Sequence, residues 1–256
     1  MVDFPSKSES LITVTTPSQS IWVLELHNGD DSRLSRYMIE QAFYPALDFV
    51  EFEWRKQWKI ANERGLTRKA VPGSDASLQA NWKYNDVQSN PVPDLFDGSG
   101  ALIITGNLNQ DKYFCNGTNI DAFEIFRSLI TLTLLKGLDF SEAISQKDFF
   151  LVPVIASING HAFAGGWITA VASDYRVIGD WKLWACMNEV HFGSDFPLLT
   201  ALFLRSSFRS TPFIRKLMLQ GHRFNPLELL AEGAVDKVVS TADHNHQAPH
   251  PDGEVV

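Results

Sequence analysis

The sequence predicts an α/β fold in one domain, because strand-like runs alternate along the chain with segments of helical periodicity. Three runs are rich in β-branched and aliphatic residues and are bounded by turn residues: SIWVLELHN at 20–28, GALIITGN at 100–107 and FLVPVIASING at 150–160. Strands that alternate with helices are typical of an α/β architecture. With 256 residues, of which 45% are hydrophobic, the chain is long enough for one sizeable core.

The first half of the chain contains one strong helix and one polar stretch. Ser32 or Ser35 could cap the helix. Apolar residues recur at helical spacing over 32–58, at Leu34, Met38, Ala42, Phe43, Ala46, Leu47 and Val50. The residues that follow are polar and rich in Gly, Pro, Ser and Asn. We interpret 55–99 as a polar insertion or loop that is partly disordered.

The alternation continues in the second half. KYFCNGTNIDAF is predicted to be a strand end that runs into a loop at Asn116-Gly117, and residues 121–147 are predicted to be helical. After the strand at 150–160, we expect a helix and another strand in AGGWITAVASDYRVI, then a further strand and turn in WKLWACMNEVHFG.

The last part of the chain is predicted to be helical over 197–232, with breaks at Gly221 and Gly233. The hydrophilic tail at 241–256 is predicted to be disordered. These predictions leave one domain over 1–240.

Composition and charge argue against several kinds of partner. The formal net charge is −8 and the isoelectric point is about 5.3, so no basic surface for nucleic acid is expected. Cys115 and Cys186 are the only cysteines, which is no disulfide framework and suits a reducing compartment. The N-terminus resembles neither a secretory signal nor a mitochondrial transit peptide.

The longest mostly apolar stretch, FFLVPVIASINGHAFAGGWITAVA, has the length of a membrane span. Because Pro153, Asn159-Gly160 and His161 interrupt it, we interpret it as a buried strand, a turn and a buried helix. We therefore expect a soluble protein with no membrane span. We also expect no metal site from the solvated histidines of the tail, which are His244, His246 and His250.

Gly165 and Gly166 are the first candidate functional residues. They follow a predicted strand and open an apolar helix, where the first backbone N–H groups have no partner within the helix. Glycine lets a ligand approach such a backbone closely, which suits an anion or an oxygen that becomes negative during a reaction. The alternative is that the two glycines only allow close packing of the helix on the strand. A second glycine-containing loop, FCNGTNID, also follows a predicted strand, and N–H groups from both loops could form an oxyanion hole.

Four stretches in this order resemble the crotonase, or enoyl-CoA hydratase/isomerase, superfamily: GDDSRLS, ALIITGNLNQDKYFCNGTNID, PVIASINGHAFAGGWITAVASDYRV and LWACMNEVHFG. With GHRFNPLELLAEGAVDKVV, the resemblance covers about residues 20–54 and 100–240. It is strongest to the monofunctional 3-enoyl-CoA/2-enoyl-CoA isomerases. It implies a spiral of ββα repeats, with the usual C-terminal helical region shortened or missing. It also implies an acyl-CoA thioester as substrate, with no cofactor beyond the coenzyme A that the substrate carries.

The same resemblance implies which residues form the site. The oxyanion donors would be the backbone N–H groups of Thr118 and Gly165, and Glu189 would be the catalytic base. Ile168 stands where the hydratases of the family have their first glutamate. The substrate-binding positions would be Asn116, Gly117, Gly166 and Ile168.

A single carboxylate beside an oxyanion hole indicates an isomerase of fatty-acid β-oxidation. Glu189 would move a proton from carbon 2 of a 3-enoyl-CoA to carbon 4 and give the trans-2-enoyl-CoA. Burial among apolar neighbours would raise its pKa. The proposed apolar neighbours are Leu183, Trp184 and Val190. The alternatives are an enoyl-CoA hydratase, a non-catalytic acyl-CoA-binding protein and a thioester hydrolase.

Other residues have simpler interpretations. Cys115 is expected to be a small buried residue, and His161 a structural or pocket-wall residue. Arg33 is either a phosphate contact or a solvated charge, and Asn116 either orients the acyl group or holds its turn. The tryptophans Trp167, Trp181 and Trp184 are expected in the core or in the acyl pocket.

The resemblance implies a homotrimer or hexamer, although the C-terminal helices that build the trimer in the family are shortened or missing here. It also implies a peroxisomal location. The chain ends in GEVV and not in a Ser-Lys-Leu-type address, so a cytoplasmic location is the alternative.

Overall fold

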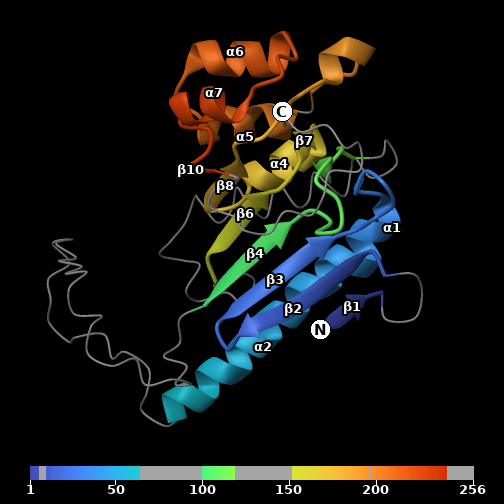
Figure 1. The fold of residues 1–256 in the computed structure, drawn as a ribbon, viewed down its shortest axis with the longest axis vertical. Helices are drawn as coiled ribbons and strands as arrows, with labels where there is room; N and C mark the ends of the chain where they lie inside the picture. The colour runs from blue at the N-terminus through green and yellow to red at the C-terminus, as the bar shows by residue number, and fades with distance from the viewer. Residues whose placement is uncertain (6–9, 64–99, 119–151, 197, 241–256) are drawn as a thin grey trace, which may run out of the picture.

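The computed structural model describes residues 1–5, 10–63, 100–118, 152–196 and 198–240 (Figure 1). The predicted α/β class is confirmed. Seven strands form the main sheet in the order β1-β2-β3-β4-β6-β8-β10. They are β1 (Val2–Phe4), β2 (Ile12–Ser18), β3 (Ile21–Leu26), β4 (Ala101–Thr105), β6 (Val154–Ile158), β8 (Tyr175–Gly179) and β10 (Lys237–Val239).

The strands from β3 onward in this order pair in parallel, whereas β1, β2 and β3 pair antiparallel. The sequence predicted β3, β4 and β6 close to their observed bounds. It did not predict β1 or β2, which extend the sheet at its N-terminal edge.

A second sheet has the order β5-β7-β9 and is entirely parallel. Its strands are β5 (Tyr113–Cys115), β7 (His161–Phe163) and β9 (Ala185–Cys186). Each follows a strand of the main sheet directly: β5 follows β4, β7 follows β6, and β9 follows β8. A strand in the large sheet followed by a strand in the small sheet is therefore a repeating unit, and in the described residues a helical segment follows it after β7 and after β9.

The first helical segment comprises α1 (Arg36–Met38), a π-helical turn (Ile39–Phe43) and α2 (Tyr44–Glu63). Ser35 is its cap, because its Oγ accepts a hydrogen bond from the N–H of Met38 at 3.1 Å. Ser32, the other predicted cap, instead donates to the carbonyl of Leu26.

The prediction of a loop from residue 55 is wrong for 55–63, which form the last part of α2. Polar residues suit the solvent-facing side of a helix, where Arg55 pairs with Glu51 and Lys56 with Glu53. Residues 64–99, the helix predicted at 121–147 and the tail at 241–256 lie outside the described residues.

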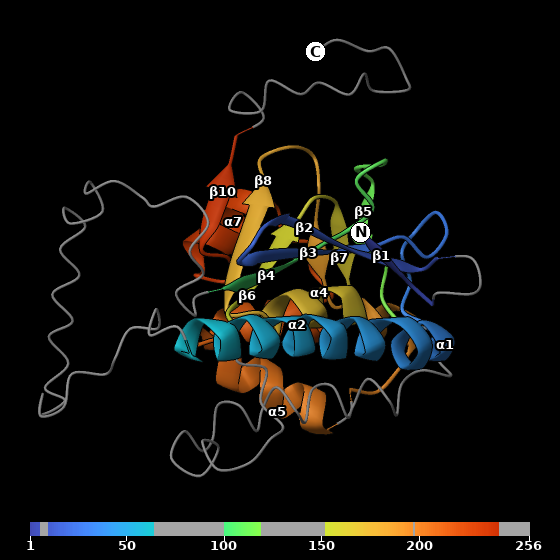
Figure 2. The ribbon, with the colours of Figure 1, turned by 90° about the horizontal axis from the view of Figure 1, so that it is seen from below.

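The remaining helical elements follow the small sheet. They are α4 (Gly165–Val171), a 3-10 helix (Glu189–Phe192), α5 (Leu198–Ser207), α6 (Thr211–Leu219) and α7 (Pro226–Ala231). Figure 2 shows α2 and α4 on the same side of the main sheet. None of the helices in the described ranges is long and apolar enough to cross a membrane.

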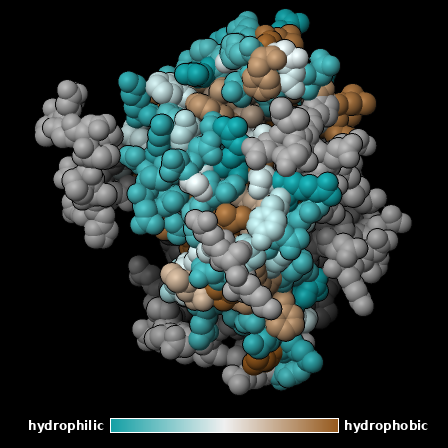
Figure 3. All heavy atoms as spheres, turned by 90° about the vertical axis from the view of Figure 1, so that its right-hand side faces the viewer, coloured by the Kyte–Doolittle hydropathy of each residue, from teal (hydrophilic) through white to brown (hydrophobic). Residues whose placement is uncertain are grey.

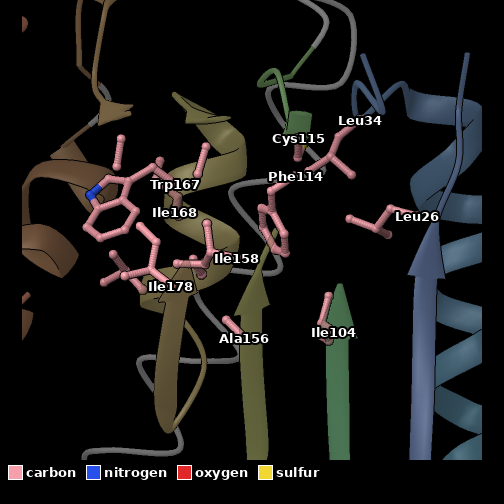
Figure 4. Packing of buried hydrophobic residues seen from close by; sticks show 14 of the residues in the cluster. Leu26, Leu34, Ile104, Phe114, Cys115, Ala156, Ile158, Trp167, Ile168 and Ile178 are labelled. Atoms are coloured by element: carbon pink, nitrogen blue, oxygen red, sulfur yellow. The ribbon is translucent and has the colours of Figure 1, made fainter. Parts of the chain in front are cut away.

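Buried side chains join the two sheets and the helices into one core. Phe114 of β5, Ile158 of β6 and Trp167 of α4 are each at most 1% exposed. In Figure 4, Phe114 and Ile158 lie by the strand ends, whereas the ring of Trp167 lies on the other side of α4 from Phe114. On the face shown in Figure 3, hydrophilic residues predominate and apolar ones form small separate groups. The core therefore fixes the carboxyl ends of the small sheet's strands, from which the candidate site is built.

Candidate active site

The three principal predicted site residues lie just beyond three neighbouring parallel strands. Thr118 follows β5, Gly165 follows β7 and Glu189 follows β9. Because the strands are parallel, their carboxyl ends meet at one edge of the small sheet, which is where ligands of parallel sheets usually bind. The middle strand carries Gly165, so this residue lies between the segments that carry the other two.

The two glycine-containing loops approach each other too closely for side chains. A Cβ atom added to Gly166 would overlap the carbonyl of Cys115, and one added to Gly165 would overlap the hydroxyl of Thr118. The Cβ position of Gly165 is 3.3 Å from the backbone nitrogen of Thr118, and that of Gly117 is 3.9 Å from the nitrogen of Gly165. Gly165 and Gly166 therefore allow the close packing of the two loops, and that packing also brings the Thr118 and Gly165 backbones together.

Within the described part of the chain, the two candidate N–H donors lack a protein acceptor. Gly165 is the first residue of α4, so its N–H has no partner within the helix, and no side chain caps this end. Across the described ranges, neither this N–H nor that of Thr118 has a protein acceptor. Gly117 has a φ of +97°, which a side chain would disfavour, and this conformation turns the loop that carries Thr118.

Ala164 forms the sharp turn between β7 and α4. It has a φ of +47° and a ψ of −119°, which is unusual for a residue with a side chain. Its N–H donates to the carbonyl of Cys186 at 2.8 Å, and its carbonyl accepts from the N–H of Ile168 at 3.0 Å. This turn therefore ties the start of α4 to the strand that leads to Glu189.

Glu189 begins a 3-10 helix and is only 6% exposed. Burial raises the pKa of this carboxyl to about 7, and a hydrogen bond from its own backbone N–H lowers it by less. Its Oε2 atom is buried and has no hydrogen-bond partner within the described part of the chain. Of its predicted apolar neighbours, Leu183 is buried, whereas Val190 is 41% exposed. A buried carboxyl with a free oxygen and a pKa near neutrality is suited to proton transfer.

Ile168 lies one turn into α4 and is 4% exposed. This is the position that the sequence resemblance matched to the first glutamate of the hydratases, and here it carries a buried apolar side chain. The described helix α4 itself carries no ionisable residue.

Asn116 is held by a residue that the sequence analysis did not identify as functional. Its side-chain amide donates to Oδ2 of Asp31 at 2.9 Å, and Arg33 donates to the same oxygen at 2.9 Å. Arg33 is thus paired with Asp31. In the sequence, Asp31 stands out only as part of the NGDD turn.

The secondary candidates have structural surroundings. Cys115 is fully buried, and burial raises the pKa of its thiol to about 12, which disfavours a thiolate nucleophile. His161 stacks between Phe163 and Trp184, and its Nδ1 accepts from the N–H of Trp184 at 3.0 Å. Burial lowers the pKa of His161, so the neutral ring is favoured. Within the described ranges, no three acidic, histidine or cysteine side chains gather as metal ligands.

Comparisons with known proteins agree on one family. A family model described as enoyl-CoA hydratase/isomerase matches residues 96–250. Enoyl-CoA delta isomerase 2, peroxisomal, of Arabidopsis thaliana is 32% identical over 85 residues, which are 33% of this chain and 35% of that protein. Carnitinyl-CoA dehydratase of Escherichia coli (strain K12) is 32% identical over 91 residues, which are 36% of this chain and 34% of that protein. The chain spans about a third of the length of these curated relatives.

Solved structures show the same fold at low sequence identity. An enoyl-CoA hydratase/isomerase family protein from Pseudomonas syringae has a TM-score of 0.59 at 19% identity, over 91% of this chain and 78% of that chain. The enoyl-CoA hydratase from Mycobacterium tuberculosis H37Rv has a TM-score of 0.54 at 17% identity, over 91% and 76%. The expected crotonase-like fold is thereby confirmed.

Proposed function

The chain belongs to the enoyl-CoA hydratase/isomerase family, and from this membership we propose that it is a 3-enoyl-CoA to 2-enoyl-CoA isomerase. The observation that carries the proposal is Glu189, a buried carboxyl with a pKa of about 7. It lies at the same sheet edge as two N–H groups that have no acceptor within the described part of the chain. Ile168 supports isomerisation over hydration, because it supplies no second carboxylate to position water.

In the proposed reaction, the thioester oxygen accepts hydrogen bonds from the N–H groups of Thr118 and Gly165. Glu189 removes a proton from carbon 2 of the 3-enoyl-CoA, and the electrons of that C–H bond form a dienolate. The same carboxyl then gives the proton to carbon 4, which leaves the double bond between carbons 2 and 3. No atom is gained or lost, so one base is sufficient.

The energetics of the site agree with this scheme. Negative charge develops on the thioester oxygen in the transition state, and one oxyanion-hole donor typically contributes about 3 kcal/mol there. A base is most effective when its pKa lies near the working pH, and burial brings Glu189 into that range. Gly117 and Gly166 contribute indirectly, because the space beside each is filled by Ala164 and by Cys115 and their packing brings the two loops together.

Hydration is the second candidate, because a carnitinyl-CoA dehydratase is among the relatives. It requires a group that positions water, and Ile168 is unsuited to that task. The proposed setting of the isomerase is fatty-acid β-oxidation with an acyl-CoA substrate and no separate cofactor. A peroxisomal location and a homotrimer or hexamer belong to the same proposal.

The test is the conversion of a cis-3-enoyl-CoA to its conjugated 2-enoyl form, followed by ultraviolet absorbance. Wild type should be active, and Glu189→Gln should lose activity by several orders of magnitude. Glu63→Gln, which changes an exposed carboxylate at the end of α2, is the matched control and should retain activity.

Three other outcomes would contradict the isomerase. Water addition to a trans-2-enoyl-CoA would indicate the hydratase, and release of free coenzyme A would indicate a thioester hydrolase. Acyl-CoA binding without turnover, unaffected by Glu189→Gln, would indicate a binding protein.

A further inference from the structure

Two loops that are far apart in the sequence are joined at the candidate oxyanion hole. The N–H of Asn116 donates to the carbonyl of Asp31, and the N–H of Leu34 donates to the carbonyl of Gly117, both at 2.9 Å. Leu34 and Thr118 also form an isolated parallel β-bridge. The segment before α1 therefore lies along the loop that carries the Thr118 N–H.

The Asp31 side chain adds a second set of contacts to this backbone ladder. Its Oδ2 accepts from the side-chain amide of Asn116 at 2.9 Å and from Nη2 and Nε of Arg33 at 2.9 and 3.2 Å. One carboxylate oxygen thus receives three donors, one of them from a residue 85 positions away. A charged acceptor makes such hydrogen bonds stronger than neutral ones.

We propose that Asp31 is a positioning residue that holds Asn116 and thereby sets the direction of the Thr118 N–H. The proposal rests on the isomerase function, in which that N–H binds the thioester oxygen. The loop from Asn116 to Thr118 belongs to no regular strand, and the φ of +97° at Gly117 lies in its middle. A glycine is conformationally permissive, so the direction of the N–H that follows it depends on what fixes the residues around it.

Asn116 accordingly acts through its bond to Asp31 and not by a direct contact of its amide nitrogen with substrate. Arg33 completes the arrangement, because its guanidinium partly neutralises the carboxylate and limits its movement. The role of Asp31 is to place a donor, so its loss should affect the transition state more than the binding of substrate.

The experiment compares Asp31→Ala, Asp31→Asn and Asp30→Ala in the full chain. Asp31→Ala should lower kcat about tenfold and change KM less than about twofold, because a small misplacement of a catalytic donor affects the reacting state most. Asp31→Asn keeps an oxygen acceptor for the Asn116 amide and should restore most of kcat. Asp30→Ala removes the neighbouring exposed carboxylate and should behave as wild type.

Amide hydrogen exchange of the segment that contains Asn116 is measured on the same proteins. Asp31→Ala should increase the exchange rate of the Asn116 N–H about tenfold, since the loop opens more often without the side-chain bond. This second measurement does not depend on turnover. If wild type converts no 3-enoyl-CoA, the proposed function fails, and the exchange rate still decides whether Asp31 holds the loop.

The two results that overturn the proposal are distinct. Unchanged kcat and unchanged exchange in Asp31→Ala would show that the bond between Asp31 and Asn116 does not hold the loop that carries Thr118. A rise in KM alone, with kcat retained, would show that Asp31 serves substrate binding and does not place the donor.

Discussion

The hydroxyl oxygen of Thr118 occupies the space that a side chain on Gly165 would need. A Cβ atom at Gly165 would overlap this oxygen, and it would also lie 3.1 Å from the Cβ of Thr118. Oγ1 of Thr118 is itself buried and has no hydrogen-bond partner in the described part of the chain. The two positions are therefore complementary in shape, and a change at one has consequences that depend on the other.

Gly165→Ala should destabilise the fold by about 2 kcal/mol, since overpacking of a tight contact typically costs 1–3 kcal/mol. Adding Thr118→Ala should recover about half of this loss, because it removes the overlapping hydroxyl but leaves the close contacts with Cβ at 3.1 Å and with the backbone nitrogen at 3.3 Å. Denaturant unfolding of wild type, the two single variants and the double variant measures the interaction free energy between the two positions. Additive effects would show that the two positions are independent.

Burial of Glu189 should make the stability of the protein depend on pH. A carboxyl with a folded pKa of about 7 and an ordinary value of 4.5 binds its proton more tightly in the folded state. The resulting stabilisation is fully present below about pH 4.5 and is lost as the pH rises through about 7. Glu189→Gln stays neutral, so above pH 7 it should be more stable than wild type by up to about 3 kcal/mol.

Unfolding of both proteins across this pH range is the measurement for Glu189. Near pH 4.5 the two should have similar stability. Glu63→Gln, at an exposed position, controls for the loss of a charge. A difference between Glu189→Gln and wild type that does not vary with pH would contradict the raised pKa.

The proposed isomerase should gain activity as the pH rises, because the base acts in its ionised form. The value of kcat/KM reports ionisations of the free enzyme and should increase through a midpoint near pH 7, the pKa of Glu189. The profile is recorded with a cis-3-enoyl-CoA from about pH 5 to about pH 9. A flat profile over this range would argue against Glu189 as the base.

The sequence was sufficient to predict the central strands of the main sheet. β3, β4 and β6 are short apolar runs between turn residues, a pattern that is typical of buried strands. The strand over 12–18 was missed although it contains several β-branched residues, because Pro17 and the surrounding serines and threonines resemble a loop. The π-helical turn at Ile39–Phe43 leaves no signal in apolar spacing.

The partner of Asn116 could not be predicted because it is a tertiary relationship. Asp31 lies in a turn of ordinary composition, and nothing in the spacing of residues connects it with a loop 85 positions later. The positions of Thr118, Gly165 and Glu189 were expected from motifs, but their common location at one sheet edge follows from the parallel pairing of β5, β7 and β9. The order and direction of the strands therefore determine that these residues share one sheet edge, which the local sequence does not reveal.

Ala164→Gly should stabilise the protein, although the same change in a helix is normally destabilising. Ala164 has a φ of +47°, and an unfavourable backbone conformation of this kind costs about 1–3 kcal/mol. Glycine removes most of that cost but gives the unfolded chain about 0.4–1 kcal/mol more entropy. The methyl group of Ala164 also lies beside Gly117, where a hypothetical Cβ atom would be 3.2 Å from it. Ala164→Gly removes this methyl group and therefore loses some packing. The net expectation is a gain of about 1 kcal/mol in the free energy of unfolding.

Ala201→Gly, inside α5, is the control and should lose about 1 kcal/mol. Equal losses in the two variants would mean that the turn before Gly165 is not strained.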